Sequence, residues 1–234
     1  MKLTWMVVRA VLFDMDGVIT DTMPYHYQAW RSVLSREEGI LVSHQEIYER
    51  EGQEGGVSVR ELLEAHQKIY TRVKGTRILL AKEALFKRLV RPRFIPGARG
   101  ILAMMKRAGI PLALVTGTSR HEMMRLLPSK ILRCFDVSVT GRDVKRGKPD
   151  PEPYLKALME LNVNARDALV IENAPFGILS AKTAGITCFA IATSLPACYL
   201  KKADRVFSSF KEMKTQFRFQ DGGFSVRTSS FHEN

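Results

Sequence analysis

The chain has 234 residues, of which 45% are hydrophobic, and its formal net charge is +12. This length can bury one sizeable core, or one core with a smaller lobe, and no apolar run approaches the roughly 18 residues of a membrane-spanning helix. The basic residues are scattered and no aromatic-rich basic stripe accompanies them, so we expect neither a nucleic-acid nor a membrane partner. A basic surface would still favour phosphorylated substrates.

The first element is an apolar run over residues 3–13, followed at once by Asp14, Asp16 and Gly17. The run predicts a buried strand, and carboxylates placed directly after such a strand lie where open parallel sheets bind ligands. Two neighbouring carboxylates repel each other unless a hard cation neutralises them, and Mg²⁺ prefers oxygen ligands together with substrate phosphate. The D-x-D-G pattern therefore indicates a metal-assisted phosphate site, although on its own an acidic turn is the alternative.

A helical segment follows, because residues 23–87 read as amphipathic helices and not as strands. The helices are predicted at 25–36, 43–50, 59–73 and 77–89. Strands then alternate with helices: strands at 92–97, 111–115, 137–140, 168–171, 187–192 and 205–207, and helices at 99–108, 120–127, 153–161 and 177–184. This alternation predicts a parallel sheet with right-handed crossovers.

The predicted fold class is therefore α/β, with a Rossmann-like, three-layer core and an inserted helical domain. We expect the core to comprise residues 1–20 and 94–217, and the inserted domain to comprise residues 21–93. Residues 218–234 are rich in glycine, serine and polar residues, which predicts a flexible C-terminal tail.

Polar residues also end two later strands and occupy the loop between them. Thr116 follows the apolar run at 110–115, Glu172 and Asn173 follow the run at 168–171, and Lys148 precedes a proline in a turn-rich loop. With the D-x-D-G pattern, these residues resemble the four motifs of the haloacid dehalogenase superfamily of phosphotransferases, over about residues 8–206. The resemblance implies that the inserted domain is a helical cap of the C1 type that closes over the active site.

The resemblance also implies a role for each motif residue. Asp14 matches the nucleophile that forms an aspartyl-phosphate, and Asp16 matches the general acid and base. Thr116 matches a hydroxyl donor to a phosphoryl oxygen, and Lys148 matches the ammonium that offsets negative charge. In isolation, Thr116 would be an ordinary helix cap and Lys148 a solvated loop lysine. Mg²⁺ is the implied cofactor, with Asp14, Asp16 and the fourth motif as its ligands.

The fourth motif departs from the common pattern, because Asn173 stands where most relatives with this cap type have an aspartate. An amide oxygen can bind Mg²⁺, but the site then loses one negative charge. Glu51, in the turn Arg50-Glu51-Gly52, is a candidate to restore that charge when the cap closes, and Glu172 is a further candidate ligand. The alternative for Glu51 is a solvated glutamate beside a glycine.

A closer resemblance involves residues 21–26, 50–52, 143–149 and 170–175. These segments are similar to the subfamily IA branch of β-phosphoglucomutase-like proteins that includes bacterial inorganic pyrophosphatases. The similarity implies that Glu51 and Asn173 both belong to the metal site, and that His26 helps to set the acid-base aspartate. His26, Glu51 and Gly117 are the expected substrate or cap contacts, and a surface histidine is the alternative for His26.

The expected function is Mg²⁺-dependent hydrolysis of a small phosphorylated metabolite or of inorganic pyrophosphate, through an aspartyl-phosphate intermediate. The alternative is a phosphohexomutase, in which Asp14 returns its phosphoryl group to a sugar phosphate. A non-catalytic phospho-ligand or nucleic-acid binding protein is disfavoured, because mere binding has no need of both aspartates. Three cysteines without C-x-x-C spacing, and no recognisable cleavage site of a signal peptide, favour a cytoplasmic protein. We expect a monomer.

Overall fold

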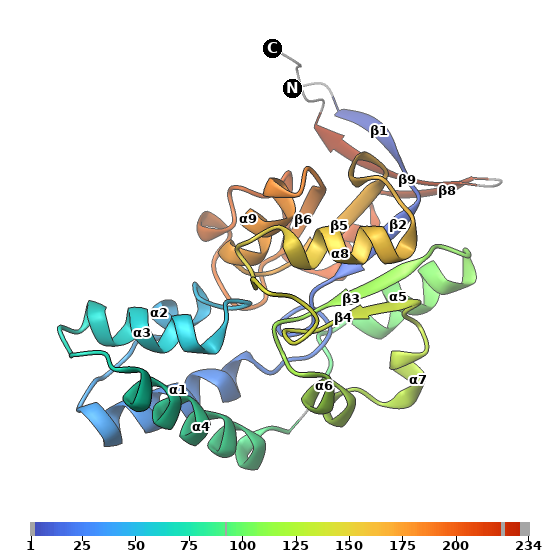
Figure 1. Cartoon of the computed structure of the whole chain (residues 1–234). Coiled ribbons are helices and arrows are strands. Elements are labelled where there is room, and N and C mark those ends of the chain that lie inside the picture. Colours follow the sequence, from blue (N-terminus) through green and yellow to red (C-terminus); the bar gives the residue numbers. More distant parts are fainter. Residues whose placement is uncertain (1–2, 92, 221–222, 230–234) are drawn as a thin grey trace.

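The computed structural model describes residues 3–91, 93–220 and 223–229. Its central element is a six-stranded parallel sheet with the strand order β4-β3-β2-β5-β6-β7 (Figure 1). This order places the first core strand in the middle of the sheet, which is the arrangement of Rossmann-like folds. The strands are β2 (Ala10–Phe13), β3 (Leu112–Val115), β4 (Val137–Val139), β5 (Ala168–Glu172), β6 (Thr187–Ile191) and β7 (Arg205–Phe207).

Helices cover both faces of this sheet because alternate side chains of each strand point to opposite sides. In β2, Val11 and Phe13 join one apolar cluster, and Ala10 and Leu12 join the other. The first cluster contains residues of α5 (Ala98–Arg107), α6 (Arg120–Leu126), α7 (Ser129–Leu132) and α10 (Phe210–Lys214), and the second contains residues of α8 (Glu152–Leu161) and α9 (Pro175–Thr183). Two short 3-10 segments, η1 (Ala165–Asp167) and η2 (Ala197–Tyr199), lie in the connections. The predicted three-layer α/β core is confirmed.

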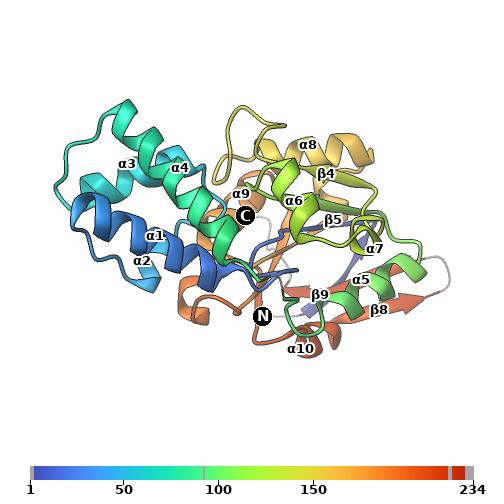
Figure 2. The ribbon, with the colours of Figure 1, turned by 90° about the horizontal axis from the view of Figure 1, so that it is seen from below.

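Four helices between β2 and α5 form the inserted cap (Figure 2). They are α1 (Met23–Glu38), α2 (His44–Tyr48), α3 (Gly55–Ala65) and α4 (Arg72–Leu89), and they share an apolar cluster that Leu195 of the core joins. The two segments that join the cap to the core run side by side, because Thr20 pairs with Phe94 and the Asp21 amide donates to the Arg93 carbonyl at 2.8 Å. This pairing supports the limits that we propose for the two domains, near residues 20 and 94.

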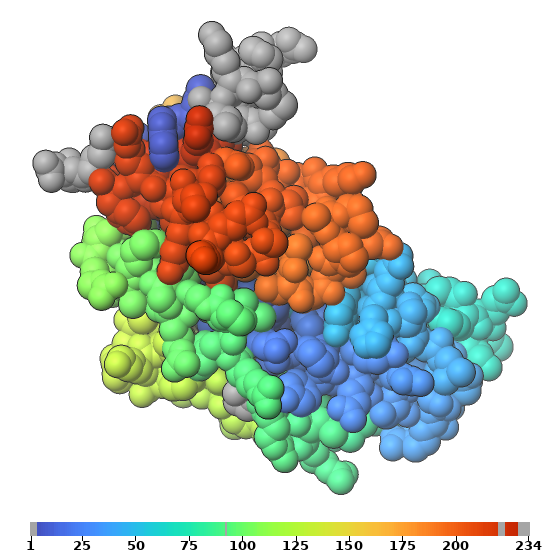
Figure 3. All heavy atoms as spheres, turned by 180° about the vertical axis from the view of Figure 1, so that it is seen from behind, coloured from blue at the N-terminus to red at the C-terminus, as the bar shows by residue number. Residues whose placement is uncertain are grey.

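A second, three-stranded antiparallel sheet brings the first strand of the chain beside the last two (Figure 1). Seen from behind, blue atoms of the N-terminal segment lie among red atoms of the C-terminal segment at the top of the molecule (Figure 3). In this terminal sheet, β9 (Gly223–Ser229) lies between β1 (Leu3–Val8) and β8 (Phe217–Gln220). Phe224 and Val226 of β9 alternate toward the core and are buried in it. The prediction of a flexible tail over 218–234 is therefore wrong for residues 218–220 and 223–229, and the remainder of that range lies outside the described residues.

Two local predictions also differ from the structure. The helix predicted at 59–73 is divided, because α3 ends at Ala65 and α4 begins at Arg72 with the Thr71 side chain as its N-cap; the segment predicted at 77–89 is the later part of α4. No strand forms over residues 93–97, where only Phe94 makes a bridge, and Pro92 lies outside the described residues. Within the described ranges, every helix is too short or too polar to cross a membrane.

Candidate active site

The carboxyl ends of β2, β3 and β5 bring three predicted motifs to one edge of the sheet. Asp14 follows β2, Thr116 follows β3, and Glu172 is the last residue of β5. Because β2 is hydrogen-bonded to both other strands, these residues are neighbours, and all three are buried. The strand order reverses between β2 and β5, which is the position where open α/β sheets bind their ligands.

Lys148 connects the three strands through its ammonium group. Its Nζ donates to Oδ1 of Asp14 at 2.6 Å, to Oε1 of Glu172 at 2.6 Å and to the carbonyl oxygen of Val115 at 3.1 Å. Burial alone would lower the pKa of Lys148, but the two carboxylates outweigh it and raise that pKa above its usual value. Tyr154, which is buried in α8, donates its hydroxyl to the same Oε1 of Glu172 at 2.8 Å. Lys148 is thus a fixed cation beside Asp14.

The carboxylate of Asp16 is held by hydroxyl groups from two loops. Thr22 donates to Oδ1, and Thr118 donates to Oδ2 at 3.1 Å. Nε2 of His26 lies 3.8 Å from Oδ1. Burial alone would raise the pKa of Asp16, but the nearby His26 ring and the hydrogen bonds from Thr22 and Thr118 outweigh it and lower that pKa below its ordinary value. The resting site therefore favours the ionised, proton-accepting form of Asp16.

His26 is itself oriented by a lysine of the cap. Nζ of Lys82 lies 2.9 Å from Nδ1 of His26, and the histidine ring stacks on Phe86 with a centroid separation of 4.0 Å. Burial and the charge of Lys82 lower the pKa of His26, against the influence of Asp16. A charged lysine can only donate, so Nδ1 is the acceptor and Nε2 carries the hydrogen that faces Asp16. The structure thus brings His26 to the predicted acid-base aspartate.

Glu51 and Asn173, which are far apart in the sequence, are in direct contact. Nδ2 of Asn173 donates to Oε2 of Glu51 at 2.9 Å and to Oγ of Ser194 at 3.0 Å. Glu51 lies in the turn after α2, so a residue of the cap reaches the edge of the core sheet. Glu51 is not the solvated glutamate of the alternative interpretation, since its Oε1 atom is fully buried.

Three buried oxygens at this site have no hydrogen-bond partner: Oδ2 of Asp14, Oε1 of Glu51 and Oδ1 of Asn173. Burying an unpaired polar atom is costly, so each such atom calls for a partner. Burial raises the pKa of Glu51 well above its usual value, and the negative charge of Asp14 adds to the rise. Burial likewise raises the pKa of Asp14 to about 8, although Lys148 opposes it. Two carboxylates and an amide oxygen with this excess of negative charge fit a hard divalent cation such as Mg²⁺.

The contacts do not favour the other two ligands expected from the sequence. Glu172 accepts four hydrogen bonds, two on each oxygen, from Lys148, Tyr154 and the main-chain amides of Asn173 and Ala174. Its carboxylate therefore serves as the counter-ion of Lys148. Both side-chain oxygens of Asp16 likewise accept from hydroxyls, which suits a proton-transfer role better than a metal ligand. Among the described residues, no cluster of three His, Cys, Asp or Glu side chains is arranged to hold a metal, and the proposed set uses Asn173 as its third donor.

The cap turn lies directly on the motif loops of the core. Gln53 bridges to Lys148, and a Cβ atom added to Gly117 would lie 3.3 Å from the carbonyl oxygen of Gly52. This approach is tight for any side chain, so Gly117 permits the cap turn to reach the second motif.

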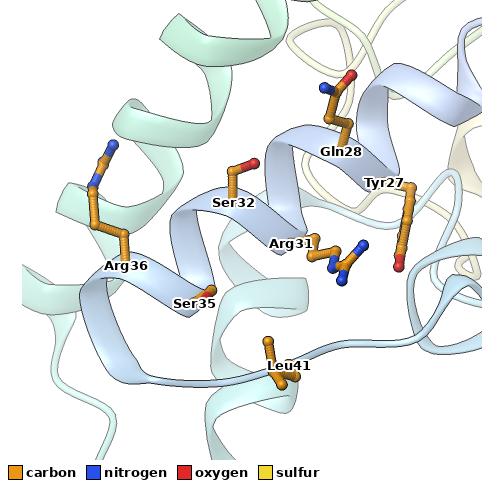
Figure 4. Close-up of a pocket in the computed structure, with 7 residues that line it drawn as sticks. All are labelled: Tyr27, Gln28, Arg31, Ser32, Ser35, Arg36 and Leu41. Atoms are coloured by element: carbon orange, nitrogen blue, oxygen red, sulfur yellow. The ribbon is translucent and has the colours of Figure 1, made fainter.

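Two surface hollows lie outside this buried site. One, of about 450 Å³, runs along α1, where the Arg31 side chain extends toward Tyr27 and Leu41 lies on the segment that follows the helix (Figure 4). The other, of about 280 Å³, lies at the cap–core boundary and is lined by Glu49, Arg50, Pro175, Phe176 and Tyr199. Neither hollow is lined by a predicted catalytic or metal-binding residue. The charged, buried cluster therefore identifies the candidate active site, and the larger hollow does not.

Five residues of the site were not identified from the sequence: Thr22, Lys82, Thr118, Tyr154 and Ser194. Thr22 and Thr118 lie close to motif residues in the sequence, and this proximity was the available signal. Lys82 lies in a helix with other lysines and looked like a solvated side chain. Tyr154 and Ser194 have no local pattern that distinguishes them from core or loop residues.

Comparison with known proteins agrees with this geometry. A family model for haloacid dehalogenase-like hydrolases matches residues 11–191. Over 182 residues, the chain is 37% identical to a phosphorylated carbohydrates phosphatase of Thermotoga maritima, which covers 76% of this chain and 82% of the relative. Over 199 residues, it is 30% identical to a β-phosphoglucomutase of Bacillus subtilis, which covers 81% of this chain and 85% of that protein.

The same likeness appears in a solved structure. A protein from Bacteroides vulgatus, provisionally named a β-phosphoglucomutase, matches with a TM-score of 0.80 and 32% identity, covering 90% of this chain and 88% of the other. The segment at 11–191 contains the four motifs and the whole cap, whereas the terminal sheet lies outside it.

Proposed function

This chain belongs to the haloacid dehalogenase-like hydrolases, and on that basis we propose that it is a Mg²⁺-dependent phosphohydrolase of small phosphorylated metabolites or of inorganic pyrophosphate. One observation carries the proposal. Asp14 is buried with one carboxylate oxygen on the Lys148 ammonium and the other unpaired, so a nucleophilic carboxylate stands beside a fixed cation and keeps one oxygen free for a metal ion. The relatives named for phosphatase and mutase activities support the same phosphoryl chemistry.

In the first step, a carboxylate oxygen of Asp14 attacks the phosphorus atom of the substrate. The bond from phosphorus to the leaving oxygen breaks, and that oxygen takes a proton from Asp16. Because the resting Asp16 is ionised, it must gain this proton as the substrate binds. Lys148 and Thr116 contribute a positive charge and a hydroxyl hydrogen where negative charge develops.

In the second step, Asp16 is the base. It removes a proton from a water molecule, the water oxygen bonds to phosphorus, and the bond from phosphorus to Asp14 breaks to release inorganic phosphate. His26 and Thr118 hold the carboxylate of Asp16 in place for both transfers.

We assign Asp14, Glu51 and Asn173 as the side chains that hold the Mg²⁺ ion. When bound, the ion would neutralise the phosphoryl oxygens and orient them for in-line attack. Glu51 reaches this position only with the cap turn seated on Gly117, and this arrangement supports a preference for compact substrates such as pyrophosphate.

A phosphohexomutase remains the second candidate, and the 30% identity to the Bacillus subtilis β-phosphoglucomutase favours it. It would use the same Asp14 and Asp16, with a sugar hydroxyl in place of water as the acceptor.

The test is phosphate release with Mg²⁺ from a panel of sugar phosphates, polyol phosphates, pyrophosphate and an aryl phosphate. Conversion of glucose 1-phosphate to glucose 6-phosphate is measured in parallel for the mutase. We expect hydrolysis that EDTA abolishes, and Asp14→Asn should lose several powers of ten in rate. A variant that keeps activity within about tenfold of the wild type, or no turnover of any substrate, would contradict the proposal.

A further inference from the structure

The use of Asn173 as a metal ligand creates a requirement that an aspartate would not have. A carboxylate offers an oxygen in either orientation, but an amide offers one oxygen and one NH₂ group. If the amide of Asn173 were rotated by half a turn about its last side-chain bond, its two N–H groups would point at the cation and repel it. Something must therefore hold the oxygen inward.

We propose that Ser194 is a positioning residue of the cation site, which acts with Glu51 to hold the amide of Asn173 with its oxygen inward. Both N–H groups of Asn173 have acceptors, Oε2 of Glu51 at 2.9 Å and Oγ of Ser194 at 3.0 Å. The remaining Oδ1 atom is buried and unpaired, as is Oδ2 of Asp14. The cation would join these two oxygens.

The two acceptors act differently. When ionised, Glu51 can accept a hydrogen bond but cannot donate one, so the NH₂ group of Asn173 must face it. The rotated amide would place Oδ1 against a carboxylate oxygen of Glu51. Ser194 can accept or donate, so it fixes the plane of the amide and takes its second N–H group. With both in place, the amide has no free rotation.

The two acceptors also belong to different domains. Glu51 moves with the cap, whereas Ser194 lies in the loop after β6 of the core. Ser194 therefore keeps hold of Asn173 when the cap opens. Gly17, of the D-x-D-G motif, makes room for this contact, because a Cβ atom there would lie 2.7 Å from Oγ of Ser194.

This inference rests on the proposed metal-dependent function and adds a residue that lies outside its four motifs. The test is a calorimetric titration of Mn²⁺ into the metal-free, full-length protein, with Mn²⁺ chosen because it prefers the same oxygen ligands as Mg²⁺. The variants are Ser194→Ala, Ser194→Thr, Asn173→Asp and the double variant Asn173→Asp with Ser194→Ala. Thermal unfolding without metal shows whether each variant is folded.

We expect Ser194→Ala to weaken Mn²⁺ binding about tenfold, which is the usual effect of losing a partner that orients a ligand. Ser194→Thr keeps the hydroxyl and should restore binding to within about threefold of the wild type. In the Asn173→Asp background, the carboxylate offers an oxygen in either orientation. Adding Ser194→Ala should therefore change the Mn²⁺ affinity less than about twofold.

An unchanged Mn²⁺ affinity in Ser194→Ala would overturn the inference while leaving the proposed function intact. An equal loss in both backgrounds would overturn it as well, since Ser194 would then support the loop and not the amide. If the wild-type protein binds no Mn²⁺ at all, the metal-dependent function itself is wrong, and the inference fails with it.

Discussion

Nζ of Lys82 donates to Nδ1 of His26 across 2.9 Å, and both side chains belong to the cap although they serve Asp16 of the core. The acid-base group is therefore assembled from two domains. Burial lowers the pKa of Lys82 to about 8, with the charges of Glu83 and Asp16 opposing the shift. A lysine with so low a pKa makes the unfolding free energy depend on pH.

The first prediction concerns this pH dependence. Between pH 8 and the ordinary lysine value near 10.5, the unfolded chain holds a proton on Lys82 that the folded chain has lost, so raising the pH favours the folded state. The unfolding free energy of the wild type, measured relative to Lys82→Met, should therefore rise by up to about 3 kcal/mol over this range. Urea denaturation at several pH values measures it, with Lys87→Met at an exposed position of the same helix as the control. A difference that does not vary with pH would contradict the lowered pKa.

The second prediction separates the two roles of Asp16. Asp16→Asn keeps the shape of the side chain but can neither protonate the leaving oxygen nor activate water, so turnover should fall by at least about a hundredfold. An activated donor such as acetyl phosphate needs little leaving-group protonation and should still phosphorylate Asp14. Mass spectrometry should then detect a long-lived phosphoenzyme, which Asp14→Asn cannot form. Rapid loss of the phosphoryl group from the Asp16→Asn variant would remove Asp16 from the second step.

The third prediction concerns substrate size. In the proposed mechanism Glu51 completes the metal site only when the cap is closed, so Glu51→Ala should lower kcat/KM for pyrophosphate far more than for an aryl phosphate, about tenfold or more against a few-fold. Raising the Mg²⁺ concentration should recover part of the loss. Glu54→Ala, three residues further on and exposed, is the matched control. Equal losses on both substrates without any Mg²⁺ dependence would leave the preference for compact substrates unsupported.

The fourth prediction tests the terminal sheet. Phe224 is 1% exposed and stacks on Phe219 with a centroid separation of 4.9 Å. Phe224→Ala should therefore destabilise the fold by about 3 to 5 kcal/mol. Trp5→Ala, at a position that is 45% exposed, should cost only about 1 kcal/mol or less. In both variants kcat should match the wild type at a temperature where the protein is folded. A stability change in Phe224→Ala no larger than that in Trp5→Ala would mean that the sheet does not pack as described.

The sequence predicted the elements whose signals are local. The strands β2, β3 and β5 are apolar runs that lead into polar motif residues, so the sequence alone predicted Asp14, Thr116 and Glu172 at one edge of the sheet. The sequence also predicted that Glu51 and Asn173 belong to one site, because the fourth motif lacks a negative charge that a carboxylate of the cap can supply. Their direct hydrogen bond is visible only in the structure.

The features that the sequence did not predict depend on partners far away in the chain. Phe224 and Val226 alternate as in a strand, but the glycine and serine residues around them are typical of a flexible tail. Their burial depends on pairing with β1, more than two hundred residues earlier. Lys82 likewise looks like any exposed helical lysine until α1 supplies His26 as its acceptor.

The pairing of β1 with β9 has a consequence for synthesis of the protein. Register places Leu3 opposite Ser229, so β1 has no partner until more than two hundred further residues have been made. At translation rates of roughly 5 to 20 residues per second, β1 waits for some ten seconds or longer. Its sequence, L-T-W-M-V-V, is uncharged and rich in strand-forming residues, which is the composition of an aggregation-prone segment. Until β9 has been made, a nascent or prematurely terminated chain therefore exposes an unpaired, aggregation-prone strand, and its need for chaperones should rise with the length of that interval.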